Sequence, residues 1–182
     1  MTNVLFINGW GGAFTSQSLA WLRNRTIAEF RDRVYAPPPV NYTNEDMLLR
    51  YLDKWKDKQI LVMLSCGCSA GDKIAGLRPN ETIPYAIHYS PSRLCGILGF
   101  PVPKNIAKVQ EVNSNYFDGF NLGAMQMIYP KKGNTTTKVM PRIFSGLPHG
   151  YTPNYLPAQE LLFAEIRASL PPDGSPNSSR RK

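Results

Sequence analysis

Ser69 stands at the centre of Gly67-Cys68-Ser69-Ala70-Gly71, a Gly-x-Ser-x-Gly pattern that can present a serine hydroxyl as a nucleophile. Glycines two positions before and two positions after the serine permit a tight turn, around which a strand and a helix pack closely. The pattern alone is a weak signal, so its setting decides its value. It directly follows the most apolar segment of the chain, residues 59–65, and we expect a short helix after it, ending near Leu77.

The remaining elements must place this serine at the edge of a sheet. Apolar runs predict strands, and helical spacing of apolar residues predicts helices. The strands are expected at 3–8, 33–36, 59–65, 84–89, 107–116 and 138–144, and the helices at 16–30, 44–58 and 157–170 besides the short one. Such alternation predicts an α/β fold, a three-layer sandwich with a mostly parallel sheet of about six strands and helices on both faces. We expect residues 1–170 to form a single domain and residues 171–182 to be a disordered basic tail.

The order of these motifs resembles the α/β-hydrolase family. The resemblance rests on the serine pattern, on Asn8-Gly9-Trp10-Gly11-Gly12 after the first strand, on an acidic residue after the penultimate strand and on His149 after the last strand. Small lidless members, such as cutinase-like and phage lysin-B-like esterases, have a similarly reduced plan. Asn8 stands where the family's glycine-rich oxyanion loop usually has histidine, which leaves open how this loop is held.

The resemblance implies a role for each of five residues. Ser69 would be the nucleophile, His149 the general base and Asp118 the acid that orients the imidazole. Backbone N–H groups of Ala70 and Trp10 would bind the oxyanion. Cofactors and metal ions are not expected, because the triad needs none and the two histidines lack a zinc-site spacing.

Most other polar residues and cysteines near these motifs are expected to have structural rather than catalytic roles. His88 falls inside a predicted strand and is interpreted as a packed residue, and Asp72 as a surface or capping group on the short helix. Glu111 is the second choice for the acid. Cys68 is interpreted as a small packed residue, because only Ser69 has glycine on both sides at the required spacing. Trp10 can either line a substrate pocket or pack in the core.

Composition limits the setting and the partners. The chain has 182 residues, a formal charge of +8 and no apolar run of membrane-spanning length. The first residues lack the features of a secretory signal, and three cysteines argue against a disulfide framework, so a cytoplasmic location is expected. No dense run of basic residues with interleaved aromatics occurs in the body of the chain, which argues against nucleic acid as a partner. The oligomeric state stays open.

The function expected from this reasoning is hydrolysis of a carboxylic ester through an acyl-enzyme intermediate. The substrate would be a small-molecule or polymeric ester, and the positive charge fits an anionic one. Two alternatives stay open. The same triad would serve an amidase, peptidase or thioesterase, and the scaffold could also belong to a non-catalytic binding protein.

Overall fold

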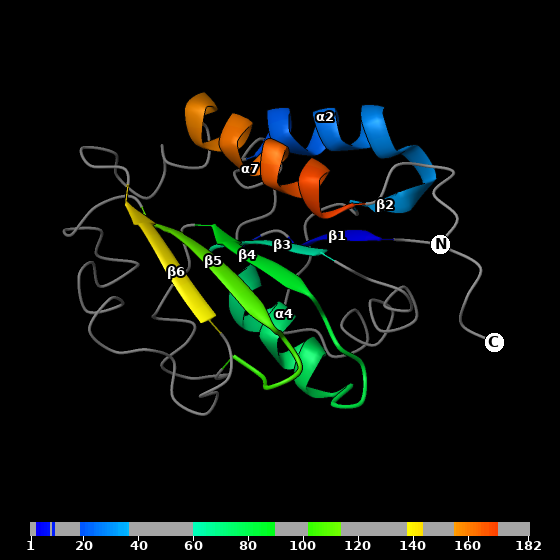
Figure 1. Ribbon diagram of the computed structural model, residues 1–182, viewed down its shortest axis with the longest axis vertical. Coiled ribbons are helices and arrows are strands. Elements are labelled where there is room, and N and C mark those ends of the chain that lie inside the picture. Colours follow the sequence, from blue (N-terminus) through cyan, green and yellow to red (C-terminus); the bar gives the residue numbers. More distant parts are fainter. Residues whose placement is uncertain are drawn as a thin grey trace.

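Six parallel strands form one sheet at the centre of the molecule (Figure 1). The computed structural model describes residues 3–7, 9, 19–36, 60–89, 102–113, 138–143 and 155–170. The strands are β1 (Val4–Ile7), β2 (Val34–Tyr35), β3 (Ile60–Leu64), β4 (Tyr85–Tyr89), β5 (Lys108–Asn113) and β6 (Lys138–Ile143). Their order across the sheet is β2-β1-β3-β4-β5-β6, and each neighbouring pair is parallel. All six expected strands are therefore present.

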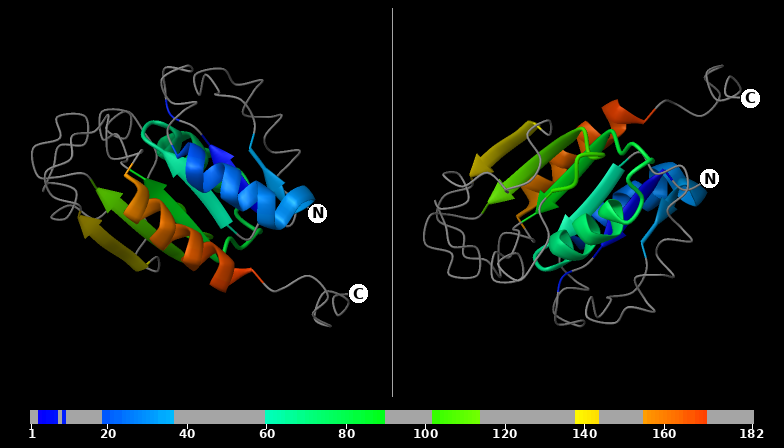
Figure 2. Two further views of the ribbon diagram at one scale, coloured as in Figure 1. Left: turned by 90° about the horizontal axis from the view of Figure 1, so that it is seen from above. Right: turned by 90° about the horizontal axis from the view of Figure 1, so that it is seen from below.

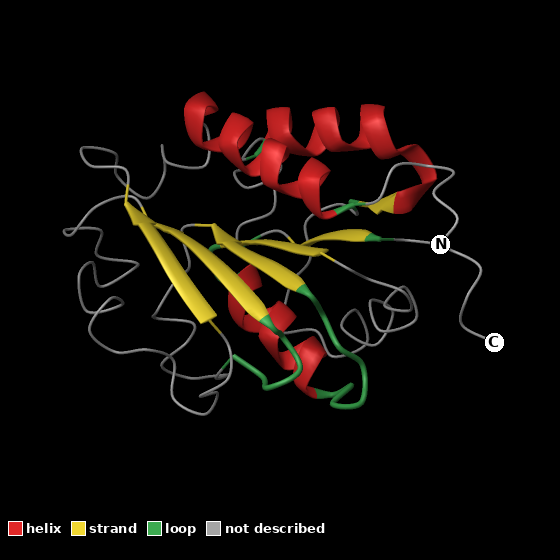
Figure 3. Cartoon of the chain, in the orientation of Figure 1, coloured by secondary structure: helices red, strands yellow, loops and turns green. Residues whose placement is uncertain are grey.

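Helices cover both faces of this sheet. Helices α2 (Ala20–Phe30) and α7 (Leu156–Ser169) lie side by side on one face, and α4 (Gly67–Gly76) lies on the other (Figures 1 and 2). A short 3-10 helix, η1 (Arg31–Arg33), joins α2 to β2. Figure 3 shows the resulting three layers, which confirm the expected α/β sandwich. The helix expected at 44–58 and the tail at 171–182 lie outside the described residues.

The central strands are apolar at nearly every position because both faces of the sheet are covered. Every residue of β1, β3 and β4 is buried. Successive side chains alternate between two core clusters, as the two-residue period of a strand requires. Leu5 and Leu61 belong to the cluster that contains residues of α4, whereas Val4 and Ile60 belong to the cluster that contains residues of α2 and α7.

The strand order reverses direction between β1 and β3. The connection through α2 carries the chain from β1 outward to β2, whereas the connection through α4 carries it from β3 in the opposite direction to β4. Right-handed crossovers in opposite directions place their helices on opposite faces, as observed here. In open α/β sheets, ligands bind outside the carboxyl ends of the strands at such a reversal. The carboxyl ends of β1 and β3 are therefore where a site is expected.

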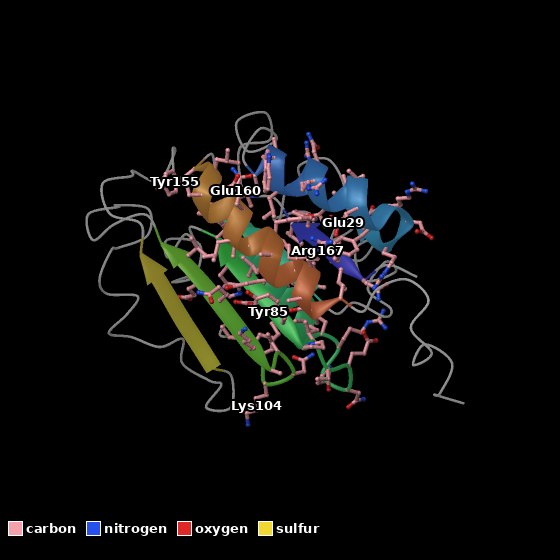
Figure 4. All side chains as sticks on the ribbon, turned by 45° about the horizontal axis from the view of Figure 1, so that its top comes forward. Glu29, Tyr85, Lys104, Tyr155, Glu160 and Arg167 are labelled. Carbon is pink, nitrogen blue, oxygen red and sulfur yellow. The ribbon has the colours of Figure 1, made fainter. Side chains whose placement is uncertain are left out.

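Helices α2 and α7 are joined by aromatic and charged contacts. Trp21 packs edge-on against Phe163 with ring centroids 6.0 Å apart. Arg167 on α7 forms an ion pair with Glu29 on α2 at 2.9 Å, and both side chains are labelled in Figure 4. Helix α2 begins at Ala20, later than the expected start at residue 16. No helix among the described residues is long and apolar enough to cross a membrane.

A side chain of α7 caps the first turn of α2. Helix α2 has no side-chain cap of its own, and its N-cap residue, Leu19, has a left-handed backbone with φ 59°. The first N–H groups of a helix have no acceptor within the helix. The N–H of Leu22 instead donates to Oε1 of buried Gln159 at 2.9 Å. Two segments far apart in the chain therefore complete one helix end.

Replacing Gln159 by methionine is expected to lower the free energy of unfolding by about 1–3 kcal/mol, because the change keeps the volume but removes a buried acceptor. Urea unfolding followed by circular dichroism measures the loss. Glu160→Met is the matched control, since Glu160 is the exposed neighbour on the same helix and exposed substitutions usually change stability by less than about 0.5 kcal/mol. Equal effects of the two substitutions would show that the cap contributes nothing.

Candidate active site

The turn between β3 and α4 consists of Ser65 and Cys66. Strand β3 ends at Leu64, and α4 begins at Gly67 with Cys66 as its N-cap residue. The expected turn over residues 67–71 is therefore wrong, because these residues already have helical hydrogen bonding. The N–H of Ala70 donates to the carbonyl of Cys66 at 3.3 Å. Ser69 lies in the first turn of α4, after the sharp change of direction.

Ser65 has a backbone conformation that serine rarely adopts. Its φ is 52°, in the left-handed region that costs a non-glycine residue roughly 1–2 kcal/mol. Among the described residues other than glycine, Leu19 and Arg31 share a positive φ, and both flank α2. Ser65 differs from them because it carries a hydroxyl and follows the last residue of a central strand. A strained serine at a strand-to-helix turn is the geometry of a nucleophile elbow.

Hydrogen bonds and close packing hold Ser65 in this position. Its N–H donates to the carbonyl of Tyr89 at 3.0 Å, and its carbonyl accepts from the N–H of Cys68 at 3.1 Å. Gly9, beyond the end of β1, approaches so closely that a Cβ there would lie 2.9 Å from Cβ of Ser65 and 3.0 Å from the carbonyl oxygen of Leu64. Glycine at position 9 therefore allows the segment after β1 to touch the turn after β3.

Gly71 serves the packing of α4 against the sheet. A Cβ at this position would lie 2.0 Å from Sδ of Met63 and 3.1 Å from Cδ1 of Ile7. The second glycine of the serine pattern is thus required by the contact between α4 and two strands.

Cys68 is buried, and its thiol donates to the carbonyl of Met63 at 3.5 Å. This confirms Cys68 as a small packed residue.

A buried polar cluster lies between α4 and the sheet. Nε2 of His88 on β4 is 3.1 Å from Oδ1 of Asp72 on α4, and Nδ1 of His88 is 3.8 Å from Oε1 of Glu111 on β5. The three residues are at most 2% exposed. The interpretation of His88 as a packed residue is confirmed. The interpretation of Asp72 as a surface or capping group is wrong, because the inward face of α4 carries it to the imidazole.

The other end of α4 is also tied to the sheet. Nδ2 of Asn105, which precedes β5, lies 3.0 Å from the carbonyl of Ala75 and 2.9 Å from that of Arg78, and 2.8 Å from that of Glu81. These acceptors lie at and beyond the carboxyl end of α4, where carbonyls lack partners within the helix. Together with the buried cluster, this amide fixes the helix whose start forms the turn at Ser65.

Tyr89 closes β4 at the same edge of the sheet. Burial raises the pKa of the Tyr89 phenol well above its ordinary value, and the phenol of Tyr155 at the start of α7 adds to the rise. The Tyr89 phenol therefore stays protonated through the neutral and moderately alkaline range. Tyr89 and Ala158 of α7 belong to the same core cluster, and the carbonyl of Tyr89 accepts the N–H of Ser65.

The bonding state of the described cysteines differs from the expectation. Cys66 takes part in a disulfide, whereas Cys68 is free. The sequence argued against a disulfide framework, and one bridge at Cys66 departs from that argument, since an odd number of cysteines is compatible with one bridge and one free thiol. The bridge ties the N-cap residue of α4. Cys95 lies outside the described residues.

The expected site residues fall partly outside the described chain. His149, Asp118 and Trp10 are outside it, and so is the side chain of Ser69. Ala70 is described, and its N–H already donates within α4. Ser65, whose backbone has a positive φ at this turn, is not among the residues expected from the sequence. The signal that could have found it is its place directly after the last residue of the apolar run, which marks the end of the strand more sharply than glycine spacing does.

Comparisons of structure place this sheet and its helices among α/β-hydrolase-like folds. The chain is similar to SOBER1 from Arabidopsis thaliana, with a TM-score of 0.57, 12% identity, and 93% of this chain and 99% of that one covered. It is also similar to NosK from Streptomyces actuosus, with a TM-score of 0.56, 13% identity, and 92% and 98% covered. No protein-family model and no curated protein sequence matches the chain.

Proposed function

We propose that this protein is a serine hydrolase that cleaves a carboxylic ester through an acyl-enzyme intermediate. The observation that carries the proposal is the turn between β3 and α4. A serine lies there at the carboxyl end of a central strand, beside the strand-order reversal, with φ 52° and with Gly9 packed against it. In an α/β-hydrolase-like fold, this is the place from which a hydroxyl attacks a carbonyl.

The proposed chemistry follows the acyl-transfer route. A serine hydroxyl of the segment from Ser65 to Ser69 attacks the ester carbonyl and gives its proton to the imidazole of His149. Collapse of the tetrahedral intermediate breaks the bond to the leaving alkoxide, which takes the proton from the imidazolium. Water then adds to the acyl-enzyme by the same steps and releases the carboxylic acid. Asp118 would orient the imidazole, and N–H groups near the turn and at Trp10 would bind the oxyanion.

His88 does not serve as the base in this proposal. Its ring lies in the buried cluster with Asp72 and Glu111 and has no exposed surface, so a substrate at the edge of the sheet is out of its reach. A general base must come within hydrogen-bond reach of the hydroxyl it deprotonates. This leaves His149, the only other histidine of the chain, for the role.

A fluorophosphonate probe tests the proposal on the full chain. The folded protein is expected to gain the mass of one adduct and to lose hydrolysis of p-nitrophenyl esters in parallel. Heat-denatured protein is the control, because an activated serine depends on the fold. An unmodified folded protein with no esterase activity would refute the serine hydrolase.

A panel of substrates separates the ester from its alternatives. Matched esters, thioesters and anilides with one acyl group are compared by kcat/KM, which reports the relative stabilisation of each transition state. We expect the oxygen ester to react fastest. A larger kcat/KM for the thioester or the anilide would assign the same site to a thioesterase or an amidase.

A further inference from the structure

We infer that the nucleophile is Ser65 and not Ser69. This inference rests on the proposed function and names the reacting atom of that site, the Oγ of Ser65. The glycine spacing in the sequence favours Ser69, whereas the position of the chain reversal, the backbone conformation and the contacts across the strand ends all favour Ser65.

The first reason is the position of the chain reversal. A nucleophile elbow places its serine on the sharp turn between strand and helix, so that the hydroxyl leaves the backbone clear of both elements. Here the residue between the end of β3 and the N-cap of α4 is Ser65. Ser69 lies in the first turn of α4, and the helix continues from there to Gly76.

The second reason is the cost of the conformation at Ser65. A positive φ is easily adopted by glycine, and serine at such a position is retained against a local preference. Neighbouring contacts enforce this backbone, since Gly9 packs against it and the carbonyl of Tyr89 accepts its N–H. A function of the hydroxyl explains why serine stands where glycine would be less strained.

The third reason is what surrounds the two serines. Ser65 is half-buried and lies where the ends of β1 and β3 meet, at the strand-order reversal. The residue after the nucleophile supplies an oxyanion N–H in this type of site. For Ser65 that residue is Cys66, at the amino end of α4, where the helix dipole favours negative charge. For Ser69 it is Ala70, whose N–H already donates to the carbonyl of Cys66.

This assignment changes the interpretation of the two glycines. Gly67 stands two residues after Ser65, at the first position of α4, and fulfils the glycine position that follows a nucleophile. The residue two before Ser65 is Met63, a departure from the usual glycine. Met63 fills the space that Gly71 leaves open, because a Cβ at Gly71 would lie 2.0 Å from its Sδ. The close approach of strand and helix is therefore provided from the helix side.

Mapping the probe adduct tests the assignment. After labelling with the fluorophosphonate, the protein is reduced, alkylated and digested with trypsin. Both serines lie in the peptide from Gln59 to Lys73, and fragment ions that break between Cys66 and Cys68 assign the adduct to one of them. We expect the adduct on Ser65. An adduct on Ser69 would overturn the inference while leaving the serine hydrolase intact, and a folded protein with neither adduct nor esterase activity would overturn both.

Two variants provide the kinetic test. Ser65→Gly is expected to lower kcat/KM for p-nitrophenyl esters by about 10⁴-fold or more and to abolish labelling. Its thermal midpoint is expected to equal or exceed that of the wild type, because glycine relieves the positive φ. Ser69→Ala is expected to retain labelling and kcat/KM within about threefold, as for a residue outside the reacting atoms.

The stability readout keeps this test decisive. A stable, folded Ser65→Gly protein that no longer reacts identifies the hydroxyl as the missing group. Retained labelling in Ser65→Gly, or loss of labelling in a folded Ser69→Ala protein, would overturn the inference.

Discussion

Replacing Asp72 by alanine is expected to lower the free energy of unfolding by about 3–5 kcal/mol. The substitution removes one carboxylate from a buried cluster in which the His88 imidazole lies 3.1 Å from Asp72 and 3.8 Å from Glu111. The remaining imidazole and carboxyl group would keep their desolvation cost after losing a partner. Breaking such a cluster is costlier than deleting an exposed charge.

Urea unfolding measures this loss, and an unchanged slope with a lower midpoint identifies it as a change in stability. Asp32→Ala is the matched control, because Asp32 is an exposed aspartate in η1 and is expected to change stability by less than about 0.5 kcal/mol. A double-mutant cycle of Asp72→Ala with His88→Ala then isolates the coupling between the two side chains. A loss no greater than that of the control would contradict the importance of the cluster.

Gly71→Ala has the second large expected effect, a loss of about 1–3 kcal/mol through overpacking. The sign is informative because alanine in a helix interior is ordinarily more favourable than glycine by about 1 kcal/mol. Here the new methyl group would lie 2.0 Å from Sδ of Met63, which is fully buried, and 3.1 Å from Cδ1 of Ile7. The steric cost therefore exceeds the gain in helix propensity.

The same helix supplies the control for this substitution. A Cβ at Gly76 would meet only Cβ of Pro103, at 3.9 Å, so Gly76→Ala is expected to be neutral or stabilising in thermal unfolding. Combining Gly71→Ala with Met63→Ala should cost less than the sum of the single losses, since the first methyl group fills space that the second change vacates. Additive losses would show that the two positions do not share this space.

Much of the fold could be predicted from patterns of apolar residues. Buried parallel strands are apolar on both faces, so the runs at Val4–Ile7 and Ile60–Leu64 are recognisable without neighbours. The buried faces of the helices are predicted less exactly, because they depend on which other elements pack against each helix. Ile27 has helical spacing yet is 39% exposed, whereas Thr26 is buried with its hydroxyl bonded to the carbonyl of Leu22.

The candidate site was predicted less well because its geometry is tertiary. Glycine spacing placed the turn at residues 67–71, but the backbone reverses at Ser65. Gly71 instead allows the close contact of α4 with Met63 and Ile7 on the sheet. The cluster around His88 depends on sheet register, which pairs His88 with Glu111, and on the rotation of α4. Neither the register of the sheet nor the rotation of α4 can be predicted from the sequence of one segment. The predictions for Asp118, His149 and Trp10 stay predictions, because these residues lie outside the described chain.

The capping of α2 by Gln159 has a consequence for the order of events at the ribosome. The acceptor of the Leu22 N–H, Oε1 of Gln159, lies 137 residues further along the chain. Until α7 has been synthesised, the nascent chain can form neither the finished start of α2 nor the full cover of one sheet face. That face is apolar, and exposed apolar surfaces promote aggregation or chaperone binding until they are covered. Folding of this layer is therefore expected to be completed only after α7 has been synthesised.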